Sequence, residues 1–201
     1  GDRSTAYHPM VPPLLKKDLV DFRAEDSIVN RFEEILRHNN VSDKENAFNR
    51  LIALFIAKLQ DELSKMPTQE IEFQYRQGRD TYETLQDRLQ KLHSDGMRKL
   101  MREEVLYVPN DYAANLISNY TGQHRKQLIE ELNGTLRKLK FYTNNDFAFK
   151  DVHNEELFLQ NGKVLVETVQ LLQPYRIVGT QDIQFLGDLF EQLLNQGFKQ
   201  N

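Results

Sequence analysis

Few side chains in this sequence have the types and the spacing that chemistry requires. No two of the five histidines lie within five residues of each other, so no helical turn presents a histidine pair to a metal ion. The nine glycines are isolated and never form a Gly-x-Gly pattern, which excludes the loop that cradles a dinucleotide or a phosphate. The absence of cysteine removes thiolate zinc sites, cysteine nucleophiles and disulfide scaffolds.

Adjacent carboxylates are the other candidates for chemistry. Glu33–Glu34, Glu103–Glu104 and Glu130–Glu131 are consecutive pairs, and consecutive side chains on a helix point about 100° apart. They make poor shared acid–base pairs and are typical of solvated helix faces. The run His153–Glu156 has metal-ligand residue types, but acids in a first helical turn are also favoured by the helix dipole. The sequence therefore predicts no catalytic residue and no metal ligand.

One stretch is basic within a chain whose net charge is -4. From His124 to Tyr142, five lysines and arginines stand against two glutamates, and two aromatic residues close the run. Cationic side chains bind phosphates and aromatic rings stack on bases, so the pattern predicts contact with DNA. The solvated outer face of an amphipathic helix is the commoner origin of such a pattern. The candidate DNA-contact residues are Arg125, Lys126, Arg137, Lys138, Lys140 and Tyr142, and a paired helix would add Arg76, Arg79, Arg98, Lys99 and Arg102.

The composition indicates a helical protein with extensive polar surface. The chain has 201 residues, 39% hydrophobic and 28% charged, which fits one large or two small domains. No apolar run approaches the roughly 18–20 residues of a membrane span, and no signal-peptide pattern is visible in this sequence. The chain begins at Gly1 instead of Met, so we expect a piece of a longer protein.

Apolar spacing predicts the first elements. Residues 1–24 contain three prolines and little periodicity, and we expect an extended arm or linker from an upstream segment. Apolar residues then recur with helical spacing over 27–37. Ser42 and Glu45 have capping-box spacing and open a second helix, which Pro67 closes. These two helices are predicted to form a hairpin.

The rest of the chain predicts more helices and one small ribbon. Residues 71–75 alternate apolar and polar, and we expect them to pair with 146–149 as a two-stranded β-ribbon. A leucine seam over about 80–140 predicts a long antiparallel helical hairpin. Further helices are expected over 157–172 and from about 181. The predicted fold class is mainly α: a helical bundle over 25–201 with the long hairpin and the β-ribbon.

Four strings resemble a known family. They are RFEEILRHNNVSDKENAF at 31–48, LIALFIAKLQDE at 51–62, DFAFKDVHNEELF at 146–158 and FLGDLFEQLL at 185–194. Together they resemble the helical segment that precedes the catalytic domain in adenine-specific (N-6) DNA methyltransferases. These enzymes are similar to the modification subunit of type I restriction-modification systems and to fused restriction–methylation proteins. The closing string is the most telling, since the cofactor-binding domain follows it in that family.

The resemblance implies a division of labour between domains. The parent enzyme would flip an adenine out of the duplex and methylate its amine from S-adenosylmethionine. The family's Asn-Pro-Pro motif and donor loop are absent here, so this segment would hold neither the cofactor nor a catalytic residue. The catalytic domain is expected after residue 201. The helical domain would support DNA binding and pack against specificity or restriction subunits or domains. The expected location is the cytoplasm, and no membrane partner is expected.

Two other functions stay open from the sequence. The first is a structural module whose long hairpin docks a protein partner and touches no DNA. The second is a free-standing enzyme with a novel helical site, which the lack of a convergent residue cluster disfavours.

Overall fold

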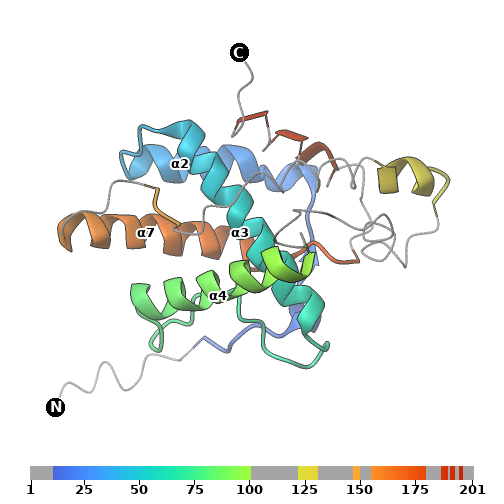
Figure 1. The fold of residues 1–201 in the computed structure, drawn as a ribbon, viewed down its shortest axis with the longest axis horizontal. Helices are drawn as coiled ribbons and strands as arrows, with labels where there is room; N and C mark the ends of the chain where they lie inside the picture. The colour runs from blue at the N-terminus through green and yellow to red at the C-terminus, as the bar shows by residue number, and fades with distance from the viewer. Residues whose placement is uncertain are drawn as a thin grey trace.

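The structure is a computed structural model that describes residues 11–100, 122–130, 147–149, 155–179, 187–189, 191–192 and 195–196. It is mainly α-helical with a small two-stranded parallel sheet (Figure 1). Its helices include α2 (Ile28–His38), α3 (Lys44–Ser64), α4 (Tyr82–Leu100) and α7 (Glu155–Leu172). Two short 3-10 helices are η1 (Lys16–Asp18) and η2 (Ala24–Asp26), and the strands are β1 (Val20–Asp21) and β2 (Tyr175–Arg176).

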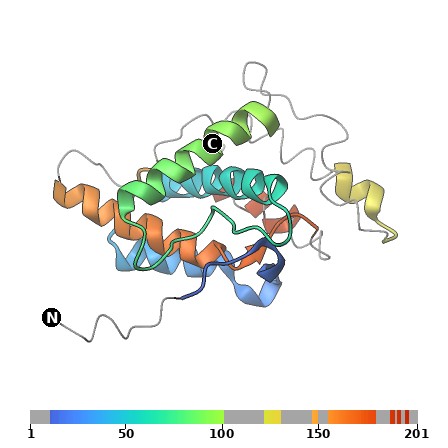
Figure 2. The same ribbon diagram turned by 90° about the horizontal axis from the view of Figure 1, so that it is seen from below.

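Helix α3 lies at the centre of the molecule. Figure 2 shows it between α4 on one side and the pair formed by α2 and α7 on the other. Every residue from Arg50 to Glu62 is buried, including the charged ones. A helix that is apolar almost all round is stable only when neighbours cover every face, and the string LIALFIA at 51–57 meets that condition here.

Helix α2 confirms the amphipathic pattern read from the sequence. Ile28, Val29, Phe32 and Leu36 are buried, while most of the charged residues between them remain in solvent. The start of α3 differs in detail from the prediction. Its N-cap is Asp43, whose side chain accepts a hydrogen bond from the backbone N–H of residue 46. The carboxylate at position 43 thus replaces the hydroxyl of Ser42 that the capping-box spacing predicted.

Aromatic rings join the elements of the core. Phe32 of α2 packs edge-on against Phe48 of α3 with ring centroids 5.1 Å apart, and Phe149 lies 6.1 Å from Phe32. The segment 147–149 is tied to α7 by Asn161, whose side chain accepts from the N–H of Phe149 and donates to the carbonyl of Phe147. The core therefore combines residues from both ends of the chain.

Helix α4 begins at Tyr82 and packs along α3, and its predicted leucine seam is buried. Gly96 allows the close approach, because a Cβ there would lie 3.0 Å from Cγ2 of Ile56. The second helix of the predicted hairpin is described only at 125–130, so its pairing with α4 falls outside the described residues. The buried seam residues are Leu85, Leu89 and Leu92.

Gly162 of α7 packs against the ring of Tyr82. This contact predicts that Gly162→Ala changes the stability of the protein in opposite directions with and without the tyrosine ring. A Cβ at Gly162 would lie 2.3 Å from Cδ2 of Tyr82. We expect Gly162→Ala to destabilise the protein by about 1–3 kcal/mol through overpacking. In a Tyr82→Ala background the same change should stabilise it by up to about 1 kcal/mol, because alanine favours the helix. Urea unfolding of the four proteins measures both values, and stabilisation in both backgrounds would contradict the contact.

Residues 71–75 do not form the predicted strand. Side chains form hydrogen bonds with the backbone groups that a neighbouring β-strand would need. Asp61 accepts from the N–H groups of Glu72 and Phe73, at 2.9 and 2.8 Å. Arg88 of α4 donates to the carbonyls of Glu72 and Gln74, each at 2.8 Å. The expected β-ribbon with 146–149 is therefore wrong at residues 71–75, and the observed sheet is formed elsewhere.

The sheet joins two segments that are far apart in the sequence. Val20 and Asp21 of β1 pair in parallel with Tyr175 and Arg176 of β2. The region predicted as an extended arm is therefore partly packed on the helices. Phe22 is 1% exposed and stacks on Tyr175 with centroids 4.7 Å apart.

Candidate functional site

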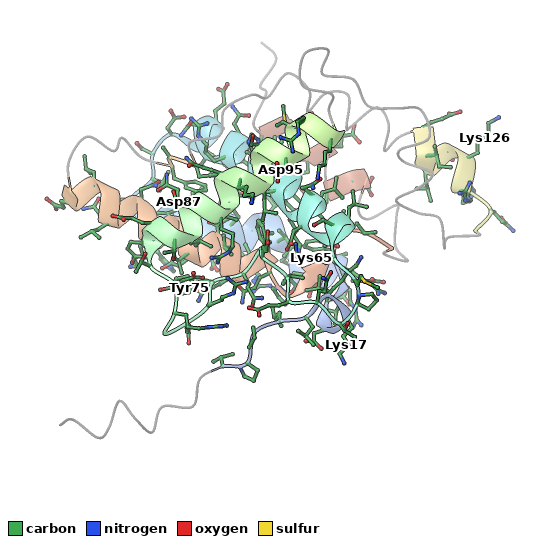
Figure 3. All side chains as sticks on the ribbon, turned by 60° about the horizontal axis from the view of Figure 1, so that its bottom comes forward. Lys17, Lys65, Tyr75, Asp87, Asp95 and Lys126 are labelled. Carbon is green, nitrogen blue, oxygen red and sulfur yellow. The ribbon has the colours of Figure 1, made fainter. Side chains whose placement is uncertain are left out.

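The predicted DNA-contact residues fall mostly outside the described part of the chain. Arg125 and Lys126 are described, on a short helical turn at 125–130 that Leu128 holds by its buried side chain. Lys126 is exposed and points away from the main body (Figure 3). Arg125 is half-buried. The residues outside the described ranges are Arg137, Lys138, Lys140 and Tyr142.

Three of the arginines that were expected to extend this basic face have local acidic partners. Arg76 and Arg79 both reach the carboxylate of Glu70, at 2.7 and 3.5 Å. Arg98 pairs with Asp95 at 2.8 Å. Tyr75, the neighbour of the first arginine in the sequence, lies across the molecule from Lys126 in Figure 3. Ion pairs therefore engage three of the predicted cations, whereas Lys99 is exposed and Arg102 lies outside the described residues.

A buried charged cluster is the feature that sequence reasoning missed. Lys58 and Glu62 lie one turn apart on α3, and both side chains are buried, at 0% and 2% exposure. Nζ of Lys58 is 3.3 Å from Oε2 of Glu62 and 5.3 Å from the ring centroid of Phe73. Burial lowers the pKa of Lys58 and raises the pKa of Glu62, while the attraction between the two groups opposes both changes.

Backbone N–H groups also donate hydrogen bonds to the carboxylates of Glu62 and its neighbour Asp61. Oε1 of Glu62 accepts from the N–H groups of Ile177 and Val178, at 2.8 and 3.0 Å. The neighbouring Asp61 holds the amides of residues 72 and 73 and lies 3.1 Å from Nζ of Lys65. An i,i+4 Lys–Glu spacing inside an otherwise apolar run was the available sequence signal. The cluster binds the protein's own backbone, so it acts as a structural anchor.

His93 is the histidine that the structure places in the core. It is 1% exposed, and neither ring nitrogen has a hydrogen-bond partner. Its ring packs edge-on against Phe147 at 5.7 Å. Burial, reinforced by the positive charge of Arg50, lowers the pKa of His93 to about 4. A neutral, enclosed imidazole is suited to packing, since a substrate in solution has no route to it.

Two of the surface hollows combine both signs of charge. A cavity of about 440 Å³ between α2 and α7 is lined by Arg31, Glu34, His38 and Glu167 among others, and it combines both signs of charge. A cavity of about 290 Å³ at the α2–α3 turn contains the Lys44–Glu33 ion pair, at 2.8 Å. No group of three or more potential metal ligands occurs among the described residues.

Comparisons with protein-family models, with curated proteins and with solved structures found no match to this chain. What the fold defines is a mainly α-helical protein with one small parallel sheet and a buried anchor of charged residues. Across the described residues, every helix is too short or too polar to cross a bilayer.

Proposed function

We propose that this chain is the helical domain of an adenine-specific DNA methyltransferase from a restriction-modification system. The domain would support DNA binding and domain packing in the cytoplasm. A separate catalytic domain of the same protein would transfer the methyl group from S-adenosylmethionine. Specificity or restriction subunits or domains would be its protein partners.

The observation that supports the proposal is where the family-like strings lie in the fold. The string at 51–62 is the central, buried part of α3, and the string at 31–48 supplies Phe32 and Phe48 of the aromatic core. Phe149 from the third string packs on the same ring, and Leu189 from the closing string is buried. The resemblance therefore concerns residues that build one core. Asp61 and Glu62, which end the string at 51–62, accept hydrogen bonds from the backbone amides of residues 72–73 and 177–178.

The chain's own contribution would be electrostatic. Lys126 is exposed and has no ion-pair partner among the described residues, so its charge is available to a phosphate. The cofactor does not fit this chain, because the sequence has neither a Gly-x-Gly loop nor an Asn-Pro pair. We therefore assign no residue to S-adenosylmethionine and no chemical step to this domain.

The second candidate is a structural module that docks a protein partner and makes no DNA contact. The observation that favours it is the local neutralisation of the arginines at positions 76, 79 and 98. A cation already paired with a carboxylate releases fewer counterions from DNA than an unpaired one.

Charge reversal tests the DNA contact. We expect changing Arg137, Lys138 and Lys140 to glutamate to weaken duplex binding by at least about tenfold near 0.1 M salt. The slope of log affinity against log salt should become shallower by about 2–3, close to one per lost phosphate contact. Fluorescence anisotropy with a labelled duplex, measured over a salt series, provides both quantities.

The matched control reverses three exposed cations elsewhere and changes the net charge equally. Lys17, Arg23 and Lys91 are exposed in the structure and serve this purpose. The control should retain most of the affinity and the salt slope. Equal affinities for the two triple variants, with methylation by the full-length protein unchanged in both, would favour the protein-docking module.

A further inference from the structure

Residues 14–21, which we call the strap, lie against a loop on one side and a strand on the other. The N–H groups of Lys16 and Lys17 donate to the carbonyls of Gln69 and Pro67, each at 2.9 Å. The N–H of Ile71 donates to the carbonyl of Leu14 at 3.1 Å. The strap therefore binds residues 67–71 as a short antiparallel strand would.

A buried glutamine reinforces the first end of the strap. Gln74 is 2% exposed, and its Oε1 accepts from the N–H of Leu14 at 2.9 Å. Its Nε2 donates to the carbonyls of Leu14 and Ile71, at 3.0 and 2.6 Å. One side-chain amide thus takes up both backbone groups of Leu14 and links them to the loop.

The other end of the strap is bound to β2. The N–H of Val20 donates to the carbonyl of Pro174 at 3.0 Å, and β1 continues in parallel along Tyr175 and Arg176. The side chain of Arg176 also donates to the carboxylate of Asp21. In Figure 2 the blue strap lies beside the red-orange strand. Residues 20–21 and 175–176 are therefore held as one unit.

Helix α3 connects the two partners of the strap. Asp61 holds the amides at 72–73, in the loop that the strap covers, and Glu62 holds the amides at 177–178, directly after β2. The hydrogen bonds form a closed ring that runs from α3 through the loop, the strap and β2 back to α3. Links that belong to one hydrogen-bond network are energetically coupled, so the loss of one is expected to affect the others.

The outer half of the strap has little apolar burial to hold it. No residue from Leu14 to Asp18 is buried, whereas Leu19 is 5% exposed. Segments held chiefly by backbone hydrogen bonds at the surface open at lower cost than a packed core. Residues 14–18 of the strap are therefore the part of the ring that can open while the helices stay folded.

We propose that the ring is a conformational coupling device, in which release of the strap from residues 67–71 frees residues 177–178 from Glu62. The coupling is reciprocal, because linkage between two sites acts equally in both directions. A partner that binds the strap thereby changes how firmly Glu62 holds the segment after β2, which lies more than 150 residues further along the chain. The inference rests on the hydrogen bonds alone and does not depend on the proposed methyltransferase function.

Lys16→Pro tests the device by removing one link. Proline lacks the N–H that donates to Gln69, and it is tolerated at the first position of a helix such as η1. The preceding Leu15 has φ -98° and ψ 157°, which is the region that a residue before proline adopts. Lys16→Ala is the matched control, because both variants lose the contact from Nζ to the carbonyl of Lys65 but alanine keeps the N–H.

The readout is hydrogen exchange at the far side of the ring, measured on the whole protein by NMR or mass spectrometry. We expect the amides of Ile177 and Val178 to exchange about tenfold faster in Lys16→Pro than in Lys16→Ala, about the effect of one hydrogen bond. Core amides of α3, such as that of Phe55, report global unfolding. An unchanged rate at 177–178, or a rise no larger than that of the α3 amides, would overturn the proposal.

The reciprocal variant keeps the proposal testable if Lys16→Pro fails to fold. Glu62→Gln retains an acceptor oxygen but weakens the grip on residues 177–178 by removing the charge. We expect the amides of Lys16 and Lys17 to exchange several-fold faster in this variant, again relative to the α3 amides. Unchanged exchange in the strap would show that its two sides open independently and would reject the coupling.

Discussion

Lys58→Met should lower the free energy of unfolding by about 3–5 kcal/mol, which is the usual loss when one member of a buried ion pair is removed. Methionine fills the volume of the lysine stem but leaves the carboxylate of Glu62 without its cation, 3.3 Å away in the native protein. Urea or thermal unfolding at neutral pH measures the loss. The same substitution at exposed Lys91 is the matched control and should cost less than about 0.5 kcal/mol.

The double variant separates charge from packing. Lys58→Met with Glu62→Gln removes both charges and keeps an amide oxygen as acceptor for the N–H groups of Ile177 and Val178. We expect it to be more stable than the sum of the single losses predicts, with a coupling of about 1–3 kcal/mol. The Lys58→Met deficit should also shrink on acidification. Because burial raises the pKa of Glu62, the folded state takes up the proton before the unfolded state does.

Two results would contradict this account of the pair. Strictly additive losses in the double variant would show that Lys58 and Glu62 do not interact energetically. A cost for Lys58→Met as small as that of Lys91→Met would show that the interior lysine is not needed to compensate a charge.

His93 should make stability depend on pH below neutrality. Its pKa is about 4 in the folded protein and 6.5 in the unfolded chain, so folding favours the neutral ring. The contribution is present in full above pH 6.5 and is lost as the pH falls from 6.5 to 4. The loss should be on the order of 3 kcal/mol. The difference in unfolding free energy between the wild type and His93→Leu isolates this contribution, because the other titrating groups cancel.

NMR provides an independent check on the same residue. The imidazole carbon-bound protons of His93 should keep the chemical shifts of the neutral ring as the sample is brought from pH 7 to pH 5. A ring that titrates near pH 6.5 in the folded protein, or a stability difference that does not vary with pH, would contradict the burial of an unpaired imidazole beside Arg50.

The elements that local patterns predicted are those with a strong apolar period. Helices α2, α3 and α7 lie within one or two residues of the ranges expected from the sequence. Each carries enough apolar residues at helical spacing for any folded state to bury that face. A prediction that depended on one residue was less secure, since Asp43 and not Ser42 caps α3.

The candidate DNA-contact site stays a prediction from the sequence. The structure shows Lys126 in solvent but does not describe Arg137, Lys138, Lys140 or Tyr142, so their arrangement is untested. What the structure did change is the extension of that site. The arginines at 76 and 79 have a shared carboxylate partner at Glu70, six and nine residues earlier, a pairing that depends on how the loop folds.

By itself, the sequence determined the class of the protein: a mainly α chain whose second predicted helix carries the apolar run at 51–57. Only the tertiary structure decided what the polar residues of that helix do. Asp61 and Glu62 are ordinary acids in the sequence, yet they hold the amides of residues 72–73 and 177–178. The physical reason is how far apart in the sequence the interacting residues lie. Helical periodicity is a local property, whereas a two-residue sheet and a buried carboxylate depend on partners that only packing brings within hydrogen-bond distance.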